Sequence, residues 1–140
     1  MSATDRRIGR SIGAVLAGII TGAVLSLLTD MALRALGIMP RLGVGVTDSL
    51  LLLVTTYRIV YGVLGSYITA RLAPNRPMQH ALILGLLGTA VCILGAIMTW
   101  NNVAAYGAHW YPIVLIVTAI PCAWAGAELA ERKLHASHAI

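Results

Sequence analysis

Two oppositely charged residues, Asp30 and Arg58, lie in or beside segments that are otherwise apolar. Arg58 is the only charged residue between Ser49 and Ala70, a run long enough to cross a bilayer. A charge near the centre of such a helix costs about 2.5–3.5 kcal/mol on insertion scales, so it usually faces protein or water rather than lipid. We therefore predict an ion pair inside a helical bundle, formed directly or through a water or a bound ligand.

The predicted depths of the two residues allow this pair. Asp30 lies about 20 residues beyond the basic start of the first apolar run, and Arg58 about 13 residues before Arg71, so their heights differ by roughly 10 Å. A long arginine side chain can cover much of that difference by snorkelling. The alternative is that Arg58 is a structural clamp on helix ends and that Asp30 is an interfacial residue.

Further polar and aromatic side chains are predicted in the same half of the bundle. Together with the charged pair they form the predicted set for binding a ligand or ion: Asp30, Tyr57, Arg58, Tyr61, Trp100, Asn101, His109 and Tyr111. Ligand sites in helical bundles are built in this way, from side chains that several helices bring to one level.

No catalytic residue, metal or cofactor is predicted. Cys92 and Cys122 lie in apolar runs with no histidine expected nearby, so they are interpreted as packing residues. His80 and His109 are predicted at opposite ends of the bundle, too far apart to hold a haem between helices. The chain is therefore not expected to be an enzyme.

The composition indicates that the lipid bilayer, rather than water, is the main solvent. Hydrophobic residues make up 59% of the chain and charged residues 11%, against roughly 25% charged in soluble domains. The net charge of +5 is carried by few basic residues at the ends of apolar runs, which argues against nucleic acid as a partner. At about 20 residues per crossing, the 140 residues fit one transmembrane domain with four crossings.

The expected fold is an all-α integral membrane four-helix bundle that occupies residues 1–140 as a single domain. The helices are predicted at residues 11–34, 48–71, 78–99 and 110–131. The stretch "GIITGAVLSLL" resembles "GLLGTAVCILG", which indicates a weak parallel duplication of a two-helix unit as one alternative.

Small residues recur on one face of several predicted helices, a pattern that lets membrane helices approach closely. The glycines predicted to pack between helices are Gly18, Gly22, Gly62, Gly65, Gly85, Gly88 and Gly95. Such faces serve packing within the chain, a homo-oligomer or contact with a partner membrane protein, and the pattern does not separate these outcomes.

The distribution of basic residues predicts cytoplasmic termini. Seven basic residues fall on the side of the termini: Arg6, Arg7, Arg10, Arg71, Arg76, Arg132 and Lys133. Only Arg34 and Arg41 fall on the other side.

The expected function is that of a small multi-pass protein of a bacterial-type inner membrane, which binds or transports a small solute or ion at a polar site in its outer half. The alternative is a non-catalytic accessory or scaffold subunit of a larger membrane complex.

Overall fold

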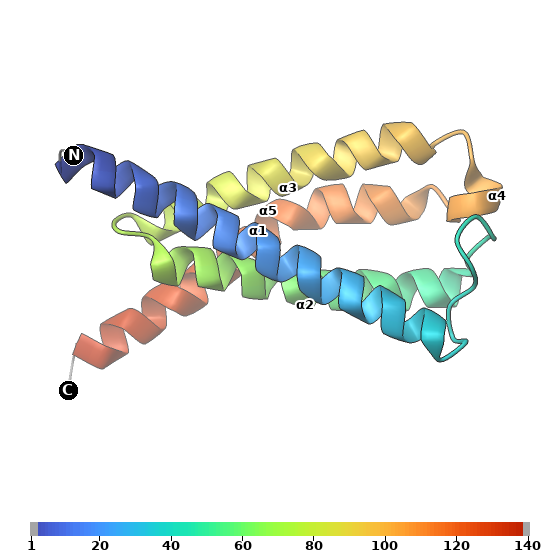
Figure 1. Cartoon of the computed structure of the whole chain (residues 1–140), viewed down its shortest axis with the longest axis horizontal. Coiled ribbons are helices and arrows are strands. Elements are labelled where there is room, and N and C mark those ends of the chain that lie inside the picture. Colours follow the sequence, from blue (N-terminus) through green and yellow to red (C-terminus); the bar gives the residue numbers. More distant parts are fainter. Residues whose placement is uncertain (1–2, 139–140) are drawn as a thin grey trace.

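Helices account for most of the chain. The computed structural model describes residues 3–138, and its long helices are α1 (Ala3–Ala35), α2 (Asp48–Leu72), α3 (Pro77–Thr99) and α5 (Trp110–His138). A one-turn helix, α4 (Val103–Tyr106), lies between α3 and α5 (Figure 1). The predicted all-α four-helix bundle is confirmed.

The helix bounds differ from the predicted ones chiefly at the two ends of the chain. α1 begins at Ala3 rather than at residue 11, and α5 continues to His138 rather than ending at residue 131. The predicted bounds stopped where the apolar runs stop, but charged residues continue both helices. In α5 an i,i+4 pair supports this extension, since Arg132 Nε lies 2.9 Å from Glu128 Oε1.

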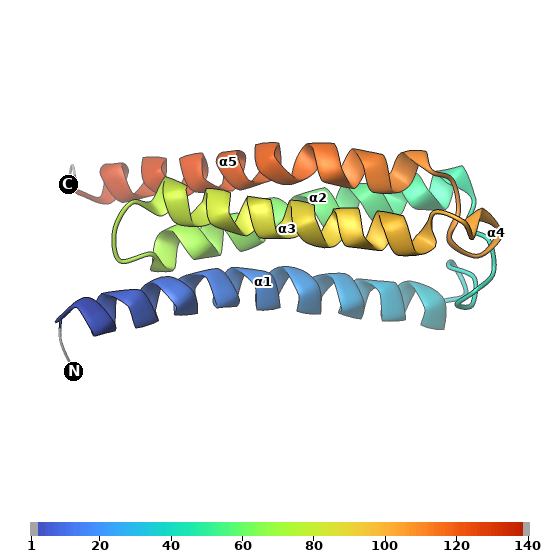
Figure 2. The same ribbon diagram turned by 90° about the horizontal axis from the view of Figure 1, so that it is seen from above.

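The long helices run side by side, and α1 begins at the same end of the bundle at which α5 ends (Figure 1). The loop of residues 36–47 and α4 lie at the opposite end, which we call the α4 end (Figure 1). α1 lies to one side of the other three long helices and packs mainly on α2 (Figure 2). All four long helices have the length and hydropathy needed to cross a membrane, as in a multi-pass membrane protein.

Most of the buried apolar residues are alanines, while most large apolar side chains point outward. Ala70, Ala81, Ala127 and Ala130 form a buried cluster. Leucine, isoleucine and valine side chains are exposed along the helices instead, as expected where lipid rather than water surrounds them. Interhelical contact therefore depends on close backbone approach more than on burial of large side chains.

The contact between α1 and α2 brings the two backbones together at Gly18 and Gly65. A Cβ atom added at Gly65 would lie 2.8 Å from the Gly18 carbonyl oxygen, which is closer than real Cβ atoms come. One turn away, the Thr69 hydroxyl donates a hydrogen bond of 3.1 Å to the Ala14 carbonyl oxygen. Glycine at both positions is thus a condition for this packing.

The other predicted packing glycines divide into two groups. A Cβ atom at Gly85 would lie 2.6 Å from Ala123 Cβ of α5, and one at Gly22 or Gly62 would make ordinary van der Waals contact. A Cβ atom added at Gly88 or Gly95 would have no neighbouring atom of residues 3–138 within 4 Å. The pattern of small residues on α3 therefore does not by itself show which glycines contact another helix.

The contrast between Gly65 and Gly95 gives a matched test of the packing. We expect Gly65→Ala to lower the free energy of unfolding by about 1–3 kcal/mol, because its new methyl group meets backbone rather than a movable side chain. Gly95→Ala should be neutral or stabilising by up to about 1 kcal/mol, since alanine favours the helix and meets nothing. SDS titration in mixed micelles measures both, and equal effects would contradict the observed contact.

Candidate functional site

Asp30 is the centre of the polar contacts near the α4 end. Its Oδ2 accepts a hydrogen bond of 3.1 Å from Arg58 Nη2, and its Oδ1 accepts one from the Tyr57 hydroxyl. The Asp30 side chain is 13% exposed and that of Arg58 is 36% exposed. The carboxylate is therefore shielded with a donor on each oxygen, while part of the guanidinium stays accessible.

The sequence order explains why two donors reach one carboxylate. Tyr57 and Arg58 are neighbours on α2, so their side chains leave the helix about 100° apart. They meet the carboxylate of Asp30, which the last turns of α1 hold in place. The predicted ion pair between Asp30 and Arg58 is present in the structure, and it is direct.

Tyrosines surround this contact. The Tyr111 ring, from α5, lies 5.9 Å from Arg58 Cζ, within the range of a cation–π interaction. The rings of Tyr57 and Tyr61 lie 5.7 Å apart. Tyr61 also shares a hydrogen bond of 2.8 Å with the Thr29 hydroxyl, which donates its own hydrogen to the Leu25 carbonyl oxygen. Three helices thus position the site.

The remaining predicted site residues lie in a separate group around α4. The rings of Trp100 and His109 stack with their centroids 4.3 Å apart, and His109 Nε2 lies 2.9 Å from the Trp100 carbonyl oxygen. Asn101 is exposed. Among the hydrogen bonds, ion pairs and ring contacts of residues 3–138, none joins these three residues to Asp30 or Arg58, so the structure does not bring the whole predicted set together.

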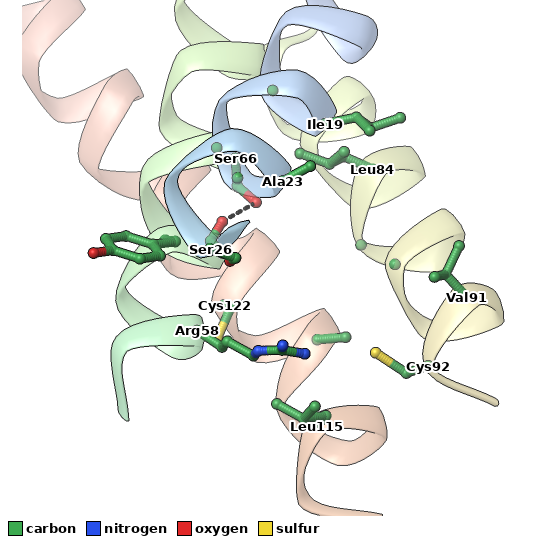
Figure 3. A pocket seen from close by; sticks show the side chains of 18 of the residues that line it. Ile19, Ala23, Ser26, Arg58, Ser66, Leu84, Val91, Cys92, Leu115 and Cys122 are labelled. Carbon is green, nitrogen blue, oxygen red and sulfur yellow. Dashed lines mark hydrogen bonds between the residues drawn. The ribbon is translucent and has the colours of Figure 1, made fainter. Parts of the chain in front are cut away.

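Asp30 and Arg58 line two cavities at once. The first, with a volume of about 550 Å³, lies among the four long helices (Figure 3). Apart from Asp30 and Arg58, its lining is uncharged and mostly apolar, and it includes Cys92 and Cys122. We call it the apolar cavity.

The second cavity, of about 150 Å³, lies at the α4 end under the loop of residues 36–47. Its charged lining residues are Arg34, Arg41, Arg58 and Asp30, three positive charges against one negative charge. The Nε atoms of Arg34 and Arg58 are buried and have no hydrogen-bond partner within residues 3–138. We call it the basic cavity, and its chemistry suits an anion, because guanidinium groups bind carboxylates and phosphates through paired N–H donors.

Sequence reasoning missed Arg34 and Arg41 as site residues, because it interpreted them only as loop charges that report topology. One signal was present, since Arg34 follows Asp30 by four residues and so shares its helix face. No sequence pattern identifies Arg41, because only the path of the loop brings it to the cavity.

Within the described chain, no group of three His, Cys, Asp or Glu side chains is placed to hold a metal ion.

Comparison with known proteins yields no matching protein-family model, no matching curated protein and no matching solved structure. Function must therefore be inferred from the geometry of the site.

Two tyrosine substitutions test whether the hydrogen bond to Asp30 stabilises the protein more than the hydrogen bond between Tyr61 and Thr29 does. Tyr57→Phe should lower the free energy of unfolding by about 1.5–3 kcal/mol, because it removes the donor to one oxygen of a shielded carboxylate. Tyr61→Phe removes a bond between two uncharged groups and should lower it by about 0.5–1.5 kcal/mol. The same SDS titration measures both variants. An effect of Tyr61→Phe as large as that of Tyr57→Phe would contradict the central place of Asp30.

Proposed function

We propose that this protein resides in a bacterial-type inner membrane with both termini in the cytoplasm and binds a small anionic solute in the basic cavity from the outer side. The carrying observation is the local excess of positive charge, three arginines against one aspartate, together with the two buried and unpartnered Nε atoms. No group of residues 3–138 pairs with these two N–H donors, so both are free to bind an anion.

The contacts of the three arginines support an anion rather than a cation as the ligand. Asp30 is occupied by Arg58 and Tyr57 on its two oxygens, which leaves little of the carboxylate for a cation. Arg34 and Arg41 make no such pair with the aspartate and stay available to a ligand. A carboxylate or a phosphate group matches the fork of a guanidinium.

Binding is better supported than ion passage. A conduction path needs polar groups along the pore, but the apolar cavity on the far side of Asp30 and Arg58 has no other charged residue in its lining. An ion that reached the basic cavity would find no comparable site deeper in the bundle. The proposed role is therefore that of a binding protein for an anionic compound.

A second candidate function is that of a non-catalytic accessory subunit. Gly9, Gly13 and Gly95 leave open space where a side chain would be, so part of the small-residue surface is not covered within the chain. A surface made of small residues allows close contact with another membrane helix. A stoichiometric partner that co-purifies in mild detergent would favour this role over self-sufficient binding.

The proposed site is tested with inorganic phosphate and acetate as probes. In a neutral detergent, and against chloride at equal ionic strength, at least one probe should raise the melting midpoint, with about 1.4 kcal/mol of stabilisation at ten times its dissociation constant. Arg34→Gln should weaken binding about tenfold or more, since it removes a charged donor. Arg10→Gln, at the opposite end of α1, serves as the matched control. An equal loss in both variants, or no shift with either probe, would contradict the anion site.

A further inference from the structure

We propose that the anion bound in the basic cavity carries an apolar chain, and that this chain occupies the apolar cavity after entering sideways from the membrane between α1 and α3. The ligand class is thus a membrane-resident amphiphile with one long chain and an anionic head. The proposal rests on the proposed anion site and specifies what the rest of the ligand is.

The first supporting observation is that the two cavities share a wall. Asp30 and Arg58 line both, so a molecule whose head contacts Arg58 in the basic cavity lies next to the apolar cavity. Figure 3 shows Arg58 at one end of the apolar cavity, whereas Ile19 and Leu84 lie toward the other. Charge at one end and apolar lining along the rest is the distribution of an amphiphile.

The second observation is that two of the hydroxyl groups that line the apolar cavity, those of Ser66 and Thr118, already donate within their own helices. Ser66 donates to the Gly62 carbonyl oxygen at 2.8 Å, and Thr118 donates to that of Val114 at 2.7 Å. Both bonds stay within one helix, so these side chains offer no free donor to a polar solute. A hydrocarbon chain requires none.

The third observation concerns access from the membrane. Leu27 of α1 and Leu87 and Val91 of α3 line the cavity and are 62%, 46% and 67% exposed. α1 and α3 pack against each other less than either packs against its main neighbour, and the two ribbons run apart in Figure 2. The opening therefore lies between two membrane-spanning helices, where lipid chains lie alongside the protein.

The length of the apolar cavity matches that of one hydrocarbon chain. Its lining extends along α1 from Gly18 to Asp30, which at 1.5 Å per residue is about 18 Å. That is close to the hydrocarbon depth of one leaflet, about 15 Å. The cavity volume of about 550 Å³ lies within the range of small-molecule sites.

A transmembrane helix from a second protein fits the same space less well. Such a helix is about 10 Å wide and extends along the whole membrane, so it needs a groove that is open at both ends. This cavity is closed at one end, where the backbones of α1 and α2 touch at Gly18 and Gly65, and it meets a charged pair at the other. A single hydrocarbon chain with an anionic head fits this shape, because the chain can stop at the closed end and the head can lie at the charged end.

The experiment uses three probes that separate head from tail: hexadecyl phosphate, hexadecanol and inorganic phosphate. The full chain is held in neutral-detergent micelles, and the half-saturating concentration of each probe is read from the rise of the melting midpoint. Because hexadecanol has no anionic head to bind the arginines of the basic cavity, it should have little effect. Hexadecyl phosphate should act at a concentration about tenfold or more below that of inorganic phosphate, because its chain concentrates it at the micelle.

Two variants show whether the tail occupies this cavity rather than the micelle. Gly88→Leu fills the cavity from a position where an added Cβ atom meets no other atom within 4 Å. Gly95→Leu adds the same side chain at a glycine whose Cβ position is equally open but which does not line the cavity. Gly88→Leu should raise the half-saturating concentration of hexadecyl phosphate and leave that of inorganic phosphate unchanged, while Gly95→Leu should change neither. If Gly88→Leu does not fold, Val91→Trp fills the same cavity from an exposed position.

The possible outcomes distinguish this inference from the anion site on which it rests. If Arg34→Gln weakens both phosphates and Gly88→Leu changes neither, the anion site stands and the tail site is overturned. If hexadecanol binds as well as hexadecyl phosphate, the assignment of the anionic head is overturned. If neither phosphate raises the melting midpoint, both proposals are overturned.

Discussion

A carboxylate and a guanidinium inside membrane-spanning helices must satisfy each other, and the arrangement of the α4 end depends on this constraint. Either charge alone, buried and unpaired, would cost several kcal/mol. Asp30 on α1 and Arg58 on α2 therefore have to lie side by side, which sets the register of the two helices. Tyr57 completes the carboxylate's contacts from the same helix.

The pair and the glycine contact together hold α1 at two points. At Gly18 and Gly65 the backbones of α1 and α2 touch, and about three turns further along α1 the ion pair joins the same two helices again. Between these points the small side chains of α1 and α3 leave the apolar cavity unfilled. The close contact that stabilises the bundle and the space that can accept a ligand are thus two results of the same glycine-rich sequence.

The sequence predicted the parts of this structure that depend on single, strong physical rules. Hydropathy and length gave the four long helices, and the cost of a charge in lipid predicted that Arg58 needs Asp30. The sequence did not reveal which small residues find a partner: Gly126 of α5, which was not predicted, would clash with Ser66 if it had a side chain, whereas Gly95 faces open space. The basic cavity also depends on how the loop of residues 36–47 places Arg41, and no periodic pattern encodes a loop path.

The most direct test of the central ion pair is a double-mutant cycle on Asp30→Asn and Arg58→Gln, measured as the free energy of unfolding in detergent. Each single variant leaves a charge without its partner, whereas the double variant removes both charges. We expect the double variant to be more stable than the sum of the single effects implies, with a coupling energy of about 1–3 kcal/mol. Additive effects, within about 0.5 kcal/mol, would contradict the pair as the interaction that holds α1 against α2.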